Sequence, residues 1–228
     1  MKVMLLAAGK GERMRPLTLE TPKPLLRVHG KALIVHHIER LAAAGLRELV
    51  INVSWLGEQI EAHCGSGEAW GVSIRYSRED EPLETAGGII RARPLLGAEP
   101  FMVVNADIFT SYPFAELALK ARELQGGQGH LVLVDNPPQH LAGDFSLRGG
   151  QVHRPDGPTL TFAGIGLYHP AFFDGLDDGS RPLKPLLLLA MDGAGLYGEH
   201  FRGAWTDVGT PQRLARLNEA PASRASTP

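Results

Sequence analysis

The chain opens with an apolar run that breaks into a glycine-containing loop, Leu5-Leu6-Ala7-Ala8-Gly9-Lys10-Gly11-Glu12-Arg13-Met14-Arg15-Pro16-Leu17-Thr18. The apolar part, residues 3–8, is typical of a buried strand. Gly9 and Gly11 allow the backbone to approach an anion closely, and the N–H groups of such a loop can form an anion-binding nest. Positive charge comes from Lys10, Arg13 and Arg15. The segment therefore predicts a strand that ends in a phosphate-binding loop.

Strands and helices alternate through the rest of the sequence. Hydrophobic patterning predicts strands over residues 48–53, 72–77, 101–105, 130–134, 159–168 and 201–206. Helices are predicted over residues 32–44, 56–64, 88–93, 114–124, 183–191 and 211–220, with Pro94 ending the third. This order predicts the α/β class, with a Rossmann-like, mixed and mostly parallel sheet and helices on both faces. Ligands of such sheets bind beyond the carboxyl ends of the strands, where the opening loop lies.

The length and composition fit one domain. The chain has 228 residues, 43% of them apolar, which is enough for one full hydrophobic core. We expect a single domain over residues 1–220. Residues 135–158 are rich in proline, glycine and polar side chains, and we interpret them as a variable insertion beside the site. Residues 221–228 are expected to form a disordered tail.

Charge and cysteine content exclude several functions. The 23 Lys and Arg residues nearly balance the 25 Asp and Glu residues, so a general nucleic-acid-binding surface is not expected. Cys64 is the only cysteine, which excludes an intrachain disulfide and a thiolate zinc cluster. No segment has the pattern of a membrane span or an export signal. These features predict a cytoplasmic protein with small-molecule partners and no membrane contact.

Two well-known phosphate loops do not fit the opening segment. A Walker A loop requires Ser or Thr directly after its Gly-Lys pair, whereas Gly11 follows Gly9-Lys10 here. A dinucleotide-binding fingerprint requires a third glycine where Met14 stands, and its loop runs directly into a helix. Pro16 disfavours such a helix. A nicotinamide-dependent oxidoreductase is therefore disfavoured.

A lysine between two prolines follows in the segment Thr21-Pro22-Lys23-Pro24-Leu25-Leu26. The prolines restrict the backbone around Lys23 to an extended form and so present its ammonium at a defined place. On this segment alone, an exposed lysine on a proline-rich loop is the simpler interpretation.

Together, residues 6–26, with the sequence LAAGKGERMRPLTLETPKPLL, closely resemble the signature of the nucleoside-diphosphate-sugar pyrophosphorylases. These enzymes join a nucleoside triphosphate to a sugar 1-phosphate and release pyrophosphate. The resemblance extends to residues 84–88, 104–107 and 205–210 and covers most of the chain. It implies a nucleotide-phosphate loop at Ala8, Gly9, Gly11 and Arg13, and a functional lysine at Lys23.

The resemblance also implies roles for these residues. Arg13 and Lys23 are expected to be catalytic, with Arg13 on the β- and γ-phosphates and Lys23 near the α-phosphate or the sugar phosphate. Further nucleotide contacts are expected from Gly87, Gly88 and Asn105, although the two glycines can equally serve only to begin a helix. For the sugar, the resemblance implies Asp144 and Gly164.

Two aspartates are the expected magnesium ligands. Asp107 and Asp207 each follow a predicted strand and are expected to meet at the carboxyl edge of one sheet. Mg²⁺ typically takes one or two carboxylates together with phosphate oxygens and water. Either aspartate alone is more simply a turn or cap residue, and the family resemblance favours the metal. Ala106 stands where the family usually has glycine.

Within the family, the sequence is most similar to the short bacterial N-acetylmuramate-1-phosphate uridylyltransferases of cell-wall recycling. The shared segments include residues 9–18, 52–61, 81–85 and 131–137, and the long C-terminal β-helix of bifunctional relatives is missing. The resemblance implies uridylyl transfer from UTP to N-acetylmuramic acid (MurNAc) 1-phosphate by a Mg²⁺-dependent monomer. Alternatives are a nucleotidyltransferase that uses glucose or mannose 1-phosphate with dTTP, UTP or GTP, and a non-catalytic sugar-nucleotide sensor.

Overall fold

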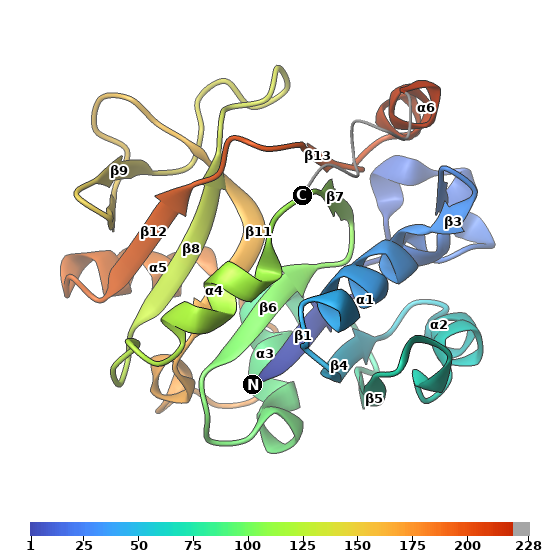
Figure 1. The fold of residues 1–228 in the computed structure, drawn as a ribbon, viewed down its shortest axis with the longest axis horizontal. Helices are drawn as coiled ribbons and strands as arrows, with labels where there is room; N and C mark the ends of the chain where they lie inside the picture. The colour runs from blue at the N-terminus through green and yellow to red at the C-terminus, as the bar shows by residue number, and fades with distance from the viewer. Residues whose placement is uncertain (221–228) are drawn as a thin grey trace.

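Nine strands form one sheet at the centre of the computed structural model, which describes residues 1–220 (Figure 1). Their order across the sheet is β5 (Ser73–Arg78), β4 (Glu48–Val53), β1 (Lys2–Leu6), β6 (Phe101–Asn105), β11 (Thr161–Tyr168), β8 (Gly129–Val134), β12 (Leu196–His200), β10 (Gln151–His153) and β9 (Ser146–Arg148). Two short ribbons lie outside the sheet. They pair β7 (Ile108–Thr110) with β13 (Trp205–Asp207), and β2 (Arg27–Val28) with β3 (Lys31–Ala32).

The sheet is mixed, because β11 runs opposite to the strands on either side of it. The pairs β5–β4, β4–β1 and β1–β6 are parallel, as is β12–β8. Strand β11 runs antiparallel to both β6 and β8. The predicted α/β class with a mixed sheet is confirmed. The parallel half brings the ends of β1 and β6 together, and this is the edge at which the opening loop begins.

Helices cover both faces of the sheet (Figure 1). One face packs against α1 (Leu33–Ala43), α2 (Gly57–Cys64) and α4 (Phe114–Lys120), and the other against α3 (Glu84–Leu96) and α5 (Lys184–Asp192). Helix α6 (Pro211–Glu219) lies beside β2, outside these layers. No helix within residues 1–220 has the length and apolarity that a membrane span requires.

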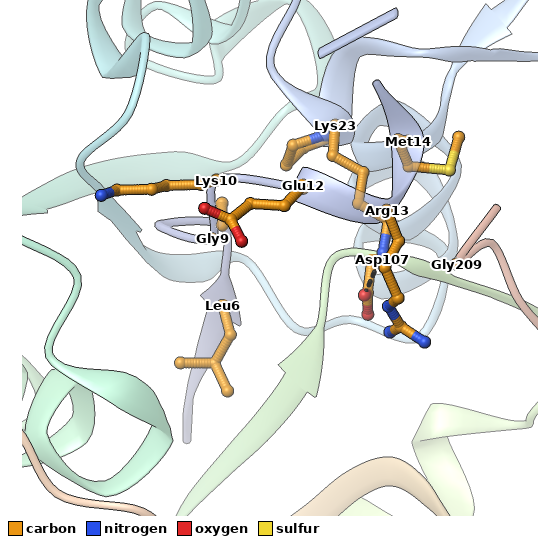
Figure 2. Close-up of a pocket in the computed structure, with 12 residues that line it drawn as sticks. Leu6, Gly9, Lys10, Glu12, Arg13, Met14, Lys23, Asp107 and Gly209 are labelled. Atoms are coloured by element: carbon orange, nitrogen blue, oxygen red, sulfur yellow. Dashed lines mark hydrogen bonds and ion pairs between the residues drawn. The ribbon is translucent and has the colours of Figure 1, made fainter. Parts of the chain in front are cut away.

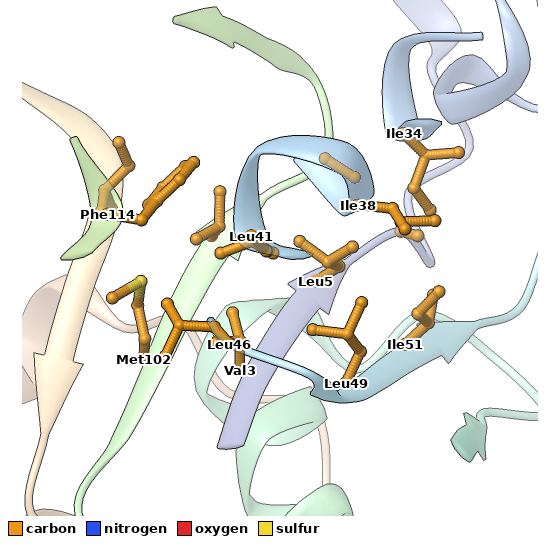
Figure 3. Packing of buried hydrophobic residues seen from close by; sticks show 14 of the residues in the cluster. Val3, Leu5, Ile34, Ile38, Leu41, Leu46, Leu49, Ile51, Met102 and Phe114 are labelled. Carbon is orange, nitrogen blue, oxygen red and sulfur yellow. The ribbon is translucent and has the colours of Figure 1, made fainter. Parts of the chain in front are cut away.

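The side chains of β1 alternate between the two faces as a buried strand requires. Val3 and Leu5 belong to the cluster under α1, whereas Met4 belongs to the cluster under α3. In Figure 3, Leu5 lies between Ile38 and Leu49, which come from α1 and β4. Burial of both faces of β1 fixes the position at which the chain leaves the sheet and enters the loop.

The structure corrects several predicted boundaries. Helix α3 begins at Glu84 and continues through Pro94 to Leu96, although Pro94 was predicted to end it. Leu96 is 2% exposed in the cluster under α3, and this burial offsets the backbone bond that Pro94 cannot make. Helix α4 also ends four residues before its predicted end, at Lys120.

The region predicted as a loose insertion, residues 135–158, contains the paired strands β9 and β10. These strands have three residues each, which is too short for alternation to be visible in a sequence. Strand β12 was also missed, and the strand predicted over residues 201–206 begins only at Trp205. Gly198 interrupts the pattern of β12, because a Cβ there would lie 2.7 Å from the Val152 side chain.

A buried histidine joins α1 to β7. The Nε2 atom of His37 lies 2.8 Å from the carbonyl oxygen of Ile108, and the side chain is 1% exposed. Burial lowers the pKa of His37 from its ordinary 6.5 to about 4. His37 is therefore neutral in the folded protein at neutral pH and serves packing rather than chemistry.

This histidine predicts a loss of stability in mild acid. Between pH 6.5 and about pH 4 the unfolded chain binds a proton at His37 and the folded chain does not, so stability falls as the pH falls through this window. Relative to His37→Leu, the wild type is expected to lose about 2 kcal/mol of unfolding free energy between about pH 7.5 and about pH 5. Urea titrations of both proteins at the two pH values measure this change in unfolding free energy. Parallel losses in the two proteins would contradict the assignment.

Candidate active site

The loop after β1 is closed by a glycine that no other residue can easily replace. Gly11 has a φ of +63°, and a Cβ at this position would lie 3.0 Å from Thr18 Cγ2 and 3.3 Å from Lys23 Cβ. The Thr18 hydroxyl donates a hydrogen bond of 2.8 Å to the Gly11 carbonyl oxygen. These contacts fold the chain back, so that Lys23 lies against the loop that begins at Gly9.

A cavity of about 410 Å³ lies at this loop, and we call it the loop cavity (Figure 2). It is lined by Leu6, Ala7, Gly9, Lys10, Gly11, Glu12, Arg13, Met14, Lys23, Pro24, Asp107 and Gly209. Five residues predicted for the site are among them: Gly9, Gly11, Arg13, Lys23 and Asp107. The fold thus places the predicted catalytic pair and one predicted metal ligand in one concave surface.

A second cavity of about 190 Å³ shares Leu6, Gly9 and Asp107 with the first, and we call it the strand-end cavity. Its other lining residues are Ala8, Asn52, Glu79, Pro82, Glu84, Thr85 and Asn105. Ala8 and Asn105, both predicted nucleotide contacts, therefore lie next to the phosphate loop. A Cβ on Gly9 would meet no atom within 4 Å, which leaves its backbone open to a ligand.

The two predicted catalytic cations have different surroundings. Lys23 is 8% exposed, and its Nζ lies 2.5 Å from Asp107 Oδ2, so it is not the exposed loop lysine of the simpler interpretation. Arg13 is exposed and makes no hydrogen bond or ion pair with residues 1–220, which leaves its guanidinium available to an anion. Figure 2 shows Lys10 pointing away from this pair.

The two predicted metal ligands lie on neighbouring segments, but not at the edge of one sheet. Asp107 follows β6 of the central sheet, whereas Asp207 ends β13 of the two-stranded ribbon, opposite Ile108. The N–H of Val208 donates to the Asp107 carbonyl oxygen at 2.8 Å, which holds the two segments together. Asp207 lines neither cavity, but a Cβ on Gly209 would lie 2.9 Å from Asp207 Oδ2, so its carboxylate lies beside Gly209, which lines the loop cavity.

The oxygen donors present fit a magnesium ion carried by a polyphosphate. No group of three or more His, Cys, Asp and Glu side chains within residues 1–220 is placed to hold a metal, so a site made of protein ligands alone is not formed there. Two carboxylates beside an anion-binding loop are the usual protein share of a Mg²⁺ site in which substrate phosphates supply further ligands. Asp107 and Asp207 match that share.

Gly87 and Gly88 line neither of these two cavities. Both lie inside α3, where a Cβ on Gly87 would be 2.2 Å from the Gly179 carbonyl oxygen. A Cβ on Gly88 would be 2.7 Å from Glu79 Oε1 and 2.8 Å from Asn52 Nδ2. Neither glycine begins the helix, because α3 begins at Glu84; both serve its packing, and their contact with the base stays a prediction.

Substitution of Gly88 separates these two roles. Gly88→Ala is expected to destabilise the protein by about 1–3 kcal/mol, because the added methyl group displaces the Asn52–Glu79 pair. Gly193→Ala is the matched control, since its Cβ would meet nothing closer than 3.8 Å. Thermal unfolding measures both. An unchanged Tm in Gly88→Ala together with weaker UTP binding would instead assign Gly88 to the base.

Sequence reasoning missed the side-chain pair that supports the loop. Asn52 Oδ1 accepts a 2.8 Å bond from the Ala7 N–H, and Asn52 Nδ2 donates to Glu79 Oε1 at 2.7 Å. Glu79, 5% exposed, also accepts the N–H of Leu83 at 2.9 Å. The available signal was a polar Asn52 within the apolar run of β4, next to the strand's carboxyl end.

The residues predicted for the sugar lie around a bulge in β11. Gly164 has a φ of +74°, and its Cβ would lie 2.7 Å from Asn105 Nδ2, which places Gly164 behind the strand-end cavity. The Asp144 carboxylate accepts the Phe162 N–H at 3.0 Å and lies 3.3 Å from His140 Nε2. Asp144 therefore supports the bulge and lines neither cavity, and its contact with a sugar stays a prediction.

Comparison with known proteins bears on the family of the chain. The sequence model described as nucleotidyl transferase matches residues 2–224. The chain is 50% identical to the N-acetylmuramate alpha-1-phosphate uridylyltransferase of Neisseria meningitidis serogroup B, over 97% of each chain. It is 33% identical to the mannose-1-phosphate guanylyltransferase catalytic subunit beta of Danio rerio, over 93% of this chain but only 62% of that protein.

Among solved structures, the fold is similar to that of a Bacillus anthracis protein described as a glucose-1-phosphate thymidylyltransferase, in complex with a sucrose. The TM-score is 0.85 at 22% identity, over 100% of this chain and 96% of the other. This likeness concerns the fold alone. The match over residues 2–224 and the 50% identical relative confirm the predicted family. The chain belongs to the nucleotidyl transferase family.

Proposed function

We propose that the protein transfers the uridylyl group of UTP to MurNAc 1-phosphate, giving UDP-MurNAc and pyrophosphate, a reaction of cell-wall recycling. The observation that carries this proposal is the loop cavity, where Arg13, Lys23 and Asp107 meet in a chain that is 50% identical to a uridylyltransferase acting on this sugar phosphate. The similarity covers 97% of both chains, which supports the same activity for this chain.

The chemistry requires positioning and charge neutralisation rather than a protein base. A sugar-phosphate oxygen attacks the α-phosphorus of UTP, a new P–O bond forms, and the bond to the β-phosphate oxygen breaks as pyrophosphate leaves. The attacking oxygen is already ionised at neutral pH. The backbone around Gly9 and Gly11 holds the phosphates, and Arg13, which has no partner within residues 1–220, stabilises the departing pyrophosphate.

Lys23 and the two aspartates complete the proposed site. Lys23 acts as a point charge near the α-phosphate, where negative charge is concentrated as the two phosphates meet. We assign Asp107 and Asp207 to Mg²⁺, which when bound neutralises phosphate charge and orients the polyphosphate. We further propose nucleotide contacts from Ala8 and Asn105 in the strand-end cavity. A cytoplasmic monomer with no nucleic-acid or membrane partner is part of the same proposal.

A specificity grid tests the substrate assignment. Pyrophosphate release is measured with Mg²⁺ for UTP, dTTP, CTP, GTP and ATP against the 1-phosphates of MurNAc, GlcNAc, glucose and mannose. The highest kcat/KM is expected for UTP with MurNAc 1-phosphate. The similarity to mannose-1-phosphate guanylyltransferases makes GTP with mannose 1-phosphate the main competitor. Preference for that pair would keep the mechanism and overturn the substrate, whereas no turnover at all would favour a sensor.

A further inference from the structure

Each of the two proposed metal-binding carboxylates forms an ion pair with a cationic side chain of this chain. Asp107 pairs with Lys23, as described above, and Asp207 Oδ2 accepts a bond from Arg213 Nη1. The other oxygen of Asp207, Oδ1, accepts a 2.7 Å bond from Gln139 Nε2. The side chains of Arg213 and Asp207 are 16% and 26% exposed, so the pair is shielded from solvent more than a surface ion pair is.

Arg213 is held in place by the start of its own helix. Thr210 precedes α6, and its hydroxyl accepts the N–H of Arg213 at 3.3 Å and the Nε–H at 3.4 Å. A Cβ on Gly209 would lie 2.7 Å from Arg213 Nη2, which places the guanidinium beside the edge of the loop cavity. Arg213 therefore competes directly with any cation that approaches Asp207 from that cavity.

Arg213 also has space on its other side. It lines a separate cavity of about 510 Å³ between the segment 134–139 and α6, and we call this the α6 cavity. Gln139 and Arg216 line it as well. A guanidinium released from Asp207 can therefore remain solvated in the α6 cavity without rearrangement of the core.

We propose that Arg213 is a positioning residue that lowers the affinity of Asp207 for a divalent cation until the polyphosphate arrives. Two carboxylates and two internal cations sum to zero charge, so a free divalent ion gains little from entering the site. A nucleoside triphosphate adds negative charge and makes the divalent ion favourable, and Asp207 then exchanges Arg213 for the metal. This inference rests on the proposed function, because it assumes a polyphosphate in the loop cavity.

Metal binding by variants of the full chain tests the proposal. Free Mn²⁺, a paramagnetic substitute for Mg²⁺, is titrated with protein and followed by its electron paramagnetic resonance signal, with and without UTP and in the absence of sugar phosphate. Arg213→Gln is expected to bind Mn²⁺ about three- to tenfold more tightly than the wild type when UTP is absent. Arg213→Lys, which keeps the charge, is expected to remain near the wild type.

Arg216→Gln is the matched control, because Arg216 lies on the same helix, lines the same cavity and makes no ion pair within residues 1–220. It is expected to leave Mn²⁺ affinity unchanged. Equal or weaker Mn²⁺ binding by Arg213→Gln, or no Mn²⁺ binding by any of the proteins, would overturn the inference. A lower Tm without a change in Mn²⁺ affinity would mean that Arg213 only stabilises the fold, and would overturn the inference as well.

The two proposals fail in different ways. If uridylyl transfer is present but Mn²⁺ affinity does not respond to Arg213, the role of Arg213 is wrong and the proposed function stands. If Mn²⁺ affinity rises in Arg213→Gln but no nucleotide and sugar pair is turned over, the assigned reaction is wrong. The effect of Arg213 on the affinity of Asp207 for a divalent cation then stands.

Discussion

Replacement of Asp107 by asparagine is expected to lower kcat for uridylyl transfer by roughly 10²- to 10³-fold, with the fold retained. The amide keeps the shape of the side chain but removes the negative charge that the proposed Mg²⁺ site needs. Asp207→Asn is expected to have a similar effect, because Asp207 pairs with Ile108, next to Asp107, and lies beside Gly209, which lines the same cavity. Steady-state rates over a range of Mg²⁺ concentrations measure both.

The control for Asp107→Asn is Asp174→Asn. Asp174 forms an ion pair of 2.5 Å with Arg93, as Asp107 does with Lys23, but it lines neither the loop cavity nor the strand-end cavity. It is expected to keep the wild-type kcat. Tm values of all three variants check that the fold survives. Near wild-type rates for both Asp107→Asn and Asp207→Asn at limiting Mg²⁺ would remove the metal assignment.

Replacement of Lys23 by alanine is expected to slow turnover by roughly 10²-fold while the KM for UTP changes by less than about threefold. The reason is that the ammonium acts on charge that builds up as the sugar phosphate meets the α-phosphorus, rather than on bound UTP. Lys23 is 8% exposed and its ammonium is held by Asp107, so the side chain is restricted to one position. Initial rates over a matrix of UTP and sugar-phosphate concentrations separate kcat from KM.

Lys31→Ala serves as the comparison, since Lys31 also pairs with a carboxylate, that of Glu39, but lies away from both cavities. Its kinetics are expected to match the wild type. If Lys23→Ala instead raised KM and left kcat unchanged, Lys23 would be a ground-state anchor for the nucleotide and not a catalytic group.

The sequence predicted the parallel half of the fold better than the rest. Strands β4 and β6 have their predicted bounds, because their apolar runs are buried on both faces and leave a clear pattern. The direction of β11 was not predictable, since this antiparallel strand is buried on both faces, as parallel strands usually are. Strands β9 and β10 are too short for patterning to reveal them.

For the candidate site, proximity along the chain decided what could be predicted. Gly11, Arg13 and Lys23 lie within residues 6–26, the segment that carries the family resemblance, and it is this resemblance rather than their spacing that implies a shared role. The Asn52–Glu79 pair joins residues from different strands, and only the folded structure brings them to Ala7. The role of Gly88 could not be predicted, because a residue without a side chain leaves room either for a ligand or for a neighbouring side chain of the protein.

The most direct test of uridylyl transfer follows the α-phosphate of UTP. The protein is incubated with Mg²⁺, MurNAc 1-phosphate and UTP labelled at the α-phosphate, and the products are separated and identified by mass. Label is expected in UDP-MurNAc, with one pyrophosphate released for each molecule formed and no transfer when the divalent ion is chelated. Label that stays in UTP with a correctly folded protein and saturating substrates would contradict it.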